Sequence, residues 1–222
     1  SHLAAAAPMT LSLSVSGFTF VGADVGGFFG NPSEELLVRW YQTGAYQPFY
    51  RAHAHIDTRR REPWLFSEAT REAIRDALRE RYALLPYWYA VFEEHATSGA
   101  PPMRPVFYEF PHDEEAFAEE RAWFVGSALL VHPVVEEGAT SVTVRLPAFE
   151  EGKKPAKWYD YHTGAPLAAG SHTLQVPLRA AVPVFQRGGS IVPVWQRIRR
   201  SAWLMKDDPY TLIVALNVDG NA

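Results

Sequence analysis

The chain has no cysteine among its 222 residues, which excludes disulfide bonds and zinc sites built from thiolates. It also lacks an excess of positive charge, because 25 acidic residues outnumber 21 basic ones and the formal net charge is −4. That balance argues against a nucleic-acid partner. No apolar run reaches the about 20 residues that a membrane-spanning helix requires. What the chain does have is a composition that is 47% hydrophobic, which is enough to build a sizeable core.

The first 98 residues alternate helices with short apolar strands. Gly17 is expected to end the first helix, Asn31 to cap the second, and Pro86 to kink the third. The strands carry no polar alternation, which is typical of strands buried on both faces of a parallel sheet. This order predicts a parallel α/β fold. The expected elements are helices 3–16, 33–46 and 67–95 and strands 18–22 and 48–51.

The pattern changes after the Gly-Ala-Pro-Pro segment at 99–102. Short strands punctuated by Gly, Pro and Thr-Gly follow one another, and one helix is expected at 113–124. Such spacing predicts a β-sandwich. The expected strands are 103–110, 127–134, 141–146, 157–161, 172–177, 182–186, 190–195 and 210–216.

The most unusual stretch runs from His53 to Trp64. It holds two imidazoles, two carboxylates and three consecutive guanidiniums, directly after an expected strand. Each of these groups must be solvated, paired or hydrogen-bonded if it is not to destabilise the fold. A strand that ends in clustered ionisable groups is how an α/β barrel presents its functional face.

A second loop, Gly22–Gly30, follows one expected strand and precedes a helix. It has neither the dinucleotide-binding glycine spacing nor a P-loop lysine, so a phosphate site is poorly supported. The glycines allow a tight turn with positive φ. Asp24 would then lie at a strand end, and Phe28 could turn over a pocket. Sugar sites need carboxylates for hydroxyls and aromatic walls for C–H faces.

The histidines and aspartates of these loops leave alternatives open. On a strand, His53 and His55 would point to one face, as in a metal-dependent barrel hydrolase. However, the other histidines offer no further ligand, and a structural His55 is favoured. Asp24 and Asp57 could form a glycosidase carboxylate pair, but nearby arginines such as Arg51 favour ion pairs that hold carboxylate pKa values down. A non-catalytic carbohydrate-binding or assembly module in the β half is a third alternative.

Several stretches together are similar to glycoside hydrolase family 31, over essentially the whole chain. The main stretches are Gly22–Phe29, Arg39–Phe49 and Arg51–Trp64, with support from Arg81–Trp88, Val184–Pro193 and Met205–Pro209. The resemblance implies that residues 1–98 are the last part of a (β/α)8 TIM barrel. It further implies a proximal β-sandwich at 99–200 and the start of a distal β domain at 201–222.

The resemblance also implies roles for individual residues. His53 matches a histidine that hydrogen-bonds the hydroxyls of the terminal glucose, and Phe28 matches the aromatic lining of that subsite. Asp24, His55 and Asp57 are expected to brace these contacts. No cofactor and no metal ligand is implied. The family's nucleophile and acid/base are aspartates on earlier barrel strands, so this segment is expected to contain no catalytic residue and to be inactive alone.

The His53–Trp64 run resembles most the branch of the family that trims α-linked glucose from N-glycans in the endoplasmic reticulum lumen. That branch implies a retaining exo-α-glucosidase, a glucosylated N-glycan as substrate and an accessory beta subunit as partner. Both ends of the chain look cut, so we expect a segment that works with an upstream polypeptide. Unclosed strands and helix faces predict that it aggregates when expressed alone.

Overall fold

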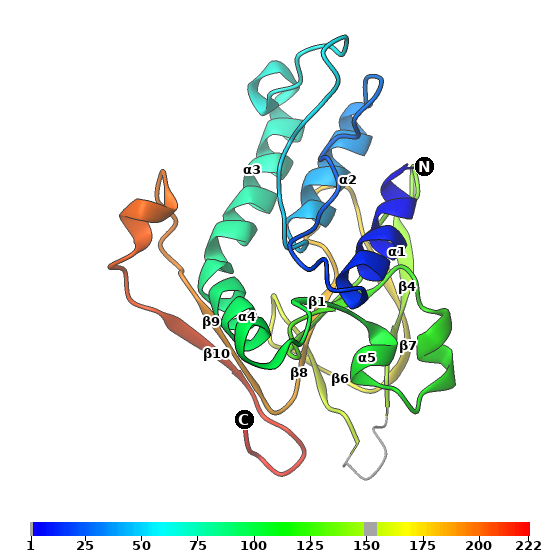
Figure 1. Ribbon diagram of the computed structural model, residues 1–222, viewed down its shortest axis with the longest axis vertical. Helices are drawn as coiled ribbons and strands as arrows, with labels where there is room; N and C mark the ends of the chain where they lie inside the picture. The colour runs from blue at the N-terminus through cyan, green and yellow to red at the C-terminus, as the bar shows by residue number, and fades with distance from the viewer. Residues whose placement is uncertain (1, 149–154) are drawn as a thin grey trace.

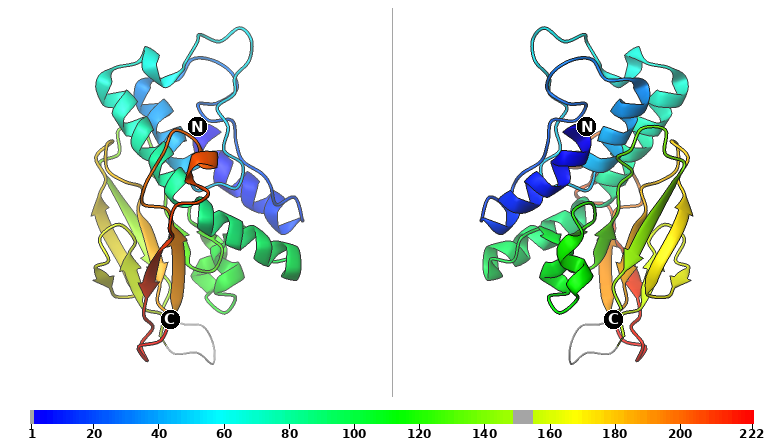
Figure 2. Two further views of the ribbon diagram at one scale, coloured as in Figure 1. Left: turned by 90° about the vertical axis from the view of Figure 1, so that its left-hand side faces the viewer. Right: turned by 90° about the vertical axis from the view of Figure 1, so that its right-hand side faces the viewer.

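The computed structural model describes residues 2–148 and 155–222. The helices α2 and α3 lie at one end of the molecule and the antiparallel strands at the other, with α4 and α5 beside the strands (Figure 1). Seen from the side, the strands lie together and α1, α4 and α5 lie on one side of them (Figure 2). Among the described residues, no helix combines the length and apolar character needed to cross a membrane.

The first helix, α1 (His2–Val15), forms where it is expected. Its buried face includes Leu3, Ala7 and Leu11, which pack into the core of the molecule. Gly17 ends it with φ of +92°, a conformation that glycine adopts without the steric cost paid by other residues. The prediction of a C-terminal glycine cap is therefore confirmed.

The two predicted parallel strands at 18–22 and 48–51 are wrong as regular strands. The two stretches of chain do run side by side, but the isolated parallel bridge in the described structure, Val25 with Ala52, lies just beyond both predicted strands. A parallel strand needs a hydrogen-bonded neighbour to continue its ladder, and within the described chain these segments have only sparse contacts such as Phe49 N to Val21 O at 2.9 Å. Phe18 is 67% exposed, so the apolar run is not covered as the sequence predicted.

The second helix, α2 (Glu34–Gly44), begins two residues after the start that a cap at Asn31 would give. Ser33 is the N-cap, since its hydroxyl accepts a hydrogen bond from Leu36 N. The predicted cap, Asn31, instead accepts a hydrogen bond from Arg59 N at 2.8 Å. The two residue types are equally good caps, so sequence preference could not choose between them.

The predicted long helix is divided into α3 (Glu68–Ala83) and α4 (Leu85–Ser98). Leu84 lies between them and serves as the cap of both. Pro86 sits in the first turn of α4, where a residue without an N–H is tolerated. The expected kink is therefore a complete break, and the chain changes direction there.

The β half contains a six-stranded antiparallel sheet in the order β1-β2-β3-β8-β5-β6 and two smaller pairs, β4–β7 and β9–β10. The strand bounds are β1 Met103–Pro105, β2 Trp123–Val125, β3 Leu129–Val131, β4 Ser141–Leu146, β5 Trp158–Asp160, β6 Pro166–Leu167, β7 Gly170–Gln175, β8 Val184–Arg187, β9 Ser190–Val194 and β10 Thr211–Ala215.

Two predicted elements of the β half are corrected. The strand expected at 103–110 ends at Pro105 and is followed by the short helix α5 (Val106–Glu109). The helix expected at 113–124 is a 3-10 helix at Glu114–Ala118 followed by β2. The side chains of Trp123 and Phe124 are fully buried within the sheet, and that burial outweighs local helical preference.

Two layers of strands enclose a core, as a sandwich requires. Val144 and Leu146 from β4 pack with Phe124, Trp158 and Phe185 from the six-stranded sheet. Trp158 is completely buried, so it is a core residue of the sandwich. β10 pairs with β9 across the predicted boundary at residue 200, and the division into domains at 98 and 200 stays a prediction.

A second core joins the helical half to the β half. It contains Leu11 of α1, Trp88 of α4, Leu129 of β3 and Val192 of β9. Trp123 of β2 also donates its indole N–H to Tyr46 O at 3.0 Å. The helical half is thus anchored directly on the sheet through α1, α4 and the turn that follows α2.

Candidate functional site

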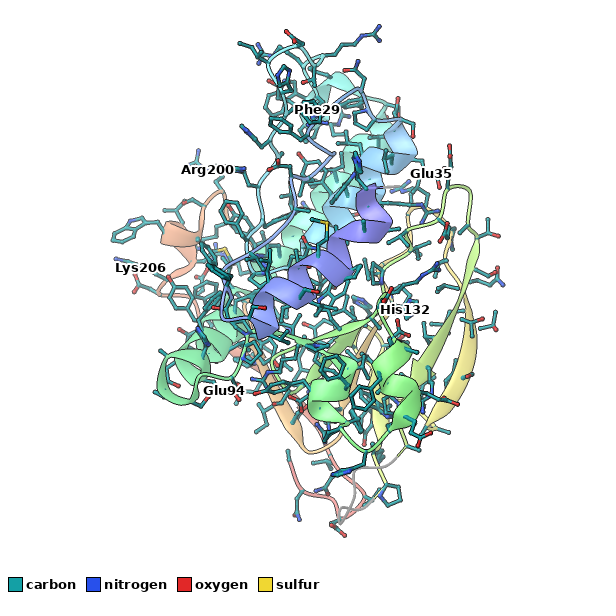
Figure 3. All side chains as sticks on the ribbon, turned by 45° about the vertical axis from the view of Figure 1, so that its right-hand side comes forward. Phe29, Glu35, Glu94, His132, Arg200 and Lys206 are labelled. Carbon is teal, nitrogen blue, oxygen red and sulfur yellow. The ribbon has the colours of Figure 1, made fainter. Side chains whose placement is uncertain are left out.

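The two loops that the sequence singled out lie together at one end of the molecule. They connect the helices at the end farthest from the sandwich (Figure 1), where Phe29 is labelled in Figure 3. Val25 N donates to Arg51 O at 3.0 Å at the base of the loops. Further out, His55 N donates to Phe28 O at 2.8 Å. These backbone bonds fix the loops to each other.

The structure brings the rings of Phe28 and His53 together. Their centroids are 5.6 Å apart with an interplanar angle of 31°. Phe29 packs edge-on against Phe28 and lies 5.4 Å from the ring of His55. His53 is exposed and Phe28 is partly exposed, so both rings are accessible to a ligand. An apolar ring beside an imidazole offers one surface for C–H groups and one set of polar atoms for hydroxyls.

The carboxylates of the loops have separate partners. Asp24 pairs with Arg51 at 2.8 Å, as the sequence indicated. Asp57 lies beside His55, with Oδ2 3.4 Å from Nδ1, and Asp57 N donates to the same Nδ1 at 3.3 Å. The side chain of Asp57 is 86% exposed, so this contact contributes little to stability. Asp24 thus has the arginine partner that the sequence indicated, whereas Asp57 contacts an imidazole where an arginine was expected. The bracing roles of these residues stay predictions.

Glu62 is another carboxylate in the run, and it also has a guanidinium partner. Arg60 Nε donates to Glu62 Oε1 at 2.9 Å. This hydrogen bond holds the pKa of Glu62 below its ordinary value, so the carboxylate is ionised at neutral pH. A carboxylate held ionised in this way is a poor general acid.

Arg61 has a different environment from its two neighbours. Its Nη1 donates to Gly26 O at 2.8 Å, and its Nη2 donates to His53 O at 2.7 Å and to Gly27 O. Burial lowers the pKa of this guanidinium, yet it remains charged at neutral pH. Sequence reasoning treated the three arginines as equivalent, because nothing in the sequence shows which of them finds main-chain partners.

A hollow of about 310 Å³ opens beside these loops. Its lining combines the imidazole of His53 with the phenol of Tyr41 and three guanidiniums. Within residues 2–148 and 155–222, no three His, Asp or Glu side chains are placed to hold a metal ion. The rings of His53 and His55 pack against Phe28 and Phe29. A metal-dependent hydrolase site needs at least one more ligand beside these two histidines, and the described residues place none there.

Two family models match the chain in sequence order. The glycosyl hydrolases family 31 TIM-barrel domain matches residues 1–91, and the glycosyl hydrolase family 31 C-terminal domain matches residues 99–192. The chain belongs to glycoside hydrolase family 31. Membership confirms the predicted fold class: the C-terminal part of a TIM barrel is followed by a C-terminal β domain, and the described sheets do not close into a barrel.

Relatives within family 31 cover nearly the whole chain. Neutral alpha-glucosidase AB of Mus musculus is 53% identical over 222 residues, which is 100% of this chain and 23% of that protein. A crystal structure of a glucosidase II alpha subunit in an alpha3-Glc2-bound form is 45% identical, with a TM-score of 0.92 over 98% of this chain and 23% of that one. An ER glucosidase II heterodimeric complex, with a catalytic subunit and the binding domain of a regulatory subunit, gives the same values.

The chain therefore spans about a quarter of the length of the family 31 relatives that it matches. Retaining glycoside hydrolysis requires two carboxyl groups about 5–5.5 Å apart. The described loops supply instead Asp24 paired with Arg51 and Glu62 paired with Arg60. The site combines an aromatic ring, an imidazole and guanidiniums.

Proposed function

We propose that this chain is part of a retaining exo-α-glucosidase that removes α-linked glucose from N-glycans. In this proposal the chain forms one wall of the glucose pocket, and an upstream polypeptide supplies the catalytic aspartates. The observation that carries the proposal is the adjacency of Phe28 and His53, 5.6 Å apart, in a chain of family 31.

His53 would hydrogen-bond hydroxyls of the terminal glucose, because its exposed imidazole carries both a donor and an acceptor in the neutral form. Phe28 would cover a C–H face of the same sugar. Asp24, His55 and Asp57 would hold these groups in place through Arg51, the ring of Phe29 and the loop backbone. None of these residues would form or break a glycosidic bond, so the segment alone would be inactive.

The proposed partners and location follow the relatives. A complex described as an ER glucosidase II heterodimer includes the binding domain of a regulatory subunit and is 45% identical over this chain. We therefore propose an accessory beta subunit, a glucosylated N-glycan substrate and the endoplasmic reticulum lumen as the location. No cofactor is required, because two carboxyl groups are sufficient for the reaction.

The test uses the enzyme at full family length. His53→Ala removes a polar contact worth about 1–3 kcal/mol, which lowers kcat/KM on a small α-glucoside by roughly 5- to 150-fold. His172 provides a matched control, because it is a half-buried histidine on β7 of the sandwich whose ring Nε2 lies 2.7 Å from the carbonyl of Ala168. Hydrolysis should release the α-anomer first, as seen by NMR. An unchanged kcat/KM for His53→Ala would sink the assignment of this wall.

A further inference from the structure

We propose that Arg61 is a positioning residue for the glucose wall, holding Phe28 and His53 against each other through three main-chain carbonyls. The inference rests on the proposed function and deepens it. It concerns a residue whose described hydrogen bonds go to the loop backbone, so its proposed effect on the substrate is exerted through the two loops.

The contacts of Arg61 span both loops. One guanidinium nitrogen binds the carbonyl of Gly26, and the other binds the carbonyls of Gly27 and His53. Gly27 is the residue immediately before Phe28, so the guanidinium connects the backbone at one ring with the backbone at the other. A shift of either loop would break at least one of these bonds.

The chemistry of this contact requires an arginine. A guanidinium is planar and presents several N–H donors in a fixed fork, so it can satisfy several carbonyls at defined angles. A lysine ammonium would supply the charge from a single atom and could not reproduce this fork. The described hydrogen bonds of Arg61 all go to carbonyls, which places its role in the geometry of the backbone.

The glycine loop is shaped around the guanidinium. Gly26 has φ of +93°, and a Cβ atom placed on it would lie 3.0 Å from Arg61 Nη1 and 3.1 Å from Leu37 Cδ1. A side chain at this position would therefore displace the guanidinium as well as strain the backbone. Gly26→Ala is thus a second and independent way to disturb the same contact.

The neighbouring arginines show that charge alone does not give this role. The side chain of Arg60 is 80% exposed and pairs with Glu62. The described hydrogen bond of Arg59 comes from its backbone N–H, which donates to Asn31 Oδ1. In the described hydrogen bonds of the three consecutive arginines, it is Arg61 whose guanidinium donates to main-chain carbonyls.

The kinetic test compares Arg61→Ala, Arg61→Lys and Gly26→Ala in the full-length enzyme, with Arg79→Ala as control. Arg79 is a surface arginine of α3 whose side chain is 57% exposed. We expect Arg61→Ala to raise KM for a small α-glucoside about tenfold while kcat changes less than about threefold, because the wall binds ground state and transition state alike. Arg61→Lys should recover part of the loss. Millimolar guanidinium chloride should lower the KM of Arg61→Ala and leave that of His53→Ala unchanged.

Hydrogen exchange gives a readout that is independent of catalysis. Arg61→Ala should speed exchange of the amides of Val25 and His55, which donate across the two loops, and leave α3 and the sandwich as protected as in the wild type.

Unchanged KM with unchanged exchange in these loops would overturn the inference. A uniform loss of protection without guanidinium rescue would overturn it too, since it would show a purely structural role. If the wild-type enzyme hydrolyses no α-glucoside, the proposed function fails and the role of Arg61 fails with it. If His53→Ala lowers kcat/KM as expected while Arg61→Ala leaves the kinetics unchanged, the proposed role of Arg61 is overturned and the proposed function stands.

Discussion

The loop that leads to His53 depends on a half-buried arginine at the end of α3, and removing it should unfold that region readily. Arg81 Nη1 donates to Ala45 O at 3.1 Å and Gln47 O at 2.6 Å, and its Nη2 donates to Pro48 O at 2.8 Å. Its guanidinium also lies 4.4 Å from the centroid of the Trp88 ring. Burial lowers its pKa to about 10, so it is charged at neutral pH.

The expected loss of stability on Arg81→Ala follows from these contacts. A hydrogen bond from a charged donor contributes about 1.5–3 kcal/mol, and a cation–π contact of this kind contributes about 1–2 kcal/mol. The three bonds share one side chain and are not additive, and truncation releases about 2 kcal/mol of side-chain entropy. Arg81→Ala should therefore cost about 3–5 kcal/mol, and Arg81→Lys about half of that, because the ammonium loses the fork.

The assay is urea unfolding of the full-length enzyme, followed by tryptophan fluorescence, with Arg79→Ala as the matched control. Arg79 is exposed and lies 3.7 Å from Asp76, so its removal should change the free energy of unfolding by less than about 0.5 kcal/mol. A loss below about 1 kcal/mol for Arg81→Ala would refute the reasoning, because it would mean that the three carbonyls find equivalent partners without the guanidinium.

Three further predictions follow from the described contacts. Burial raises the pKa of Glu80, so the folded state binds its proton more tightly than the unfolded state does. The free energy of unfolding should therefore fall as pH rises from 4.5 through the raised pKa. Glu80→Gln should flatten that pH dependence in thermal melts recorded at a series of pH values. Gly22→Ala would place a Cβ 1.9 Å from Phe49 O and should lower the free energy of unfolding by about 3 kcal/mol or more. Gly30 has φ of +73° with open space around it, so Gly30→Ala should lower it by about 1 kcal/mol. Equal losses for the two variants would contradict this steric argument. Residues 1–222 expressed alone should show no α-glucosidase activity and should aggregate on size-exclusion chromatography, because the side chains of Phe18 and Ile56 are 67% and 91% exposed; a cooperatively melting monomer would be the contrary result.

The accuracy of the sequence-based fold prediction depended on whether an element is determined by its own residues. β4 forms at 141–146 as predicted, because Val142, Val144 and Leu146 alternate with polar residues in a half-buried strand. The parallel strands at 18–22 and 48–51 were predicted from local apolar runs, but a ladder needs partners that the described chain does not supply. Similarly, the break at Leu84 depends on how α3 and α4 pack, which the position of Pro86 only suggests.

The site shows the same contrast. The pairing of Asp24 with Arg51 followed from charge and proximity to strand ends. The closeness of Phe28 and His53 was expected only because of the family resemblance. The carbonyl partners of Arg61 could not be predicted, because main-chain acceptors have no signature in the sequence. A residue type indicates which bonds a side chain can make, whereas the fold decides which groups come within reach.

The core that joins α1 and α4 to β3 and β9 has a consequence for engineering this family. A recombination crossover at the junction between the two matched domains would fall near residue 99. Such a cut would separate Trp88 from Leu129 and Val192, which pack in one cluster. Functional chimeras should therefore inherit α4 together with the strands beneath it.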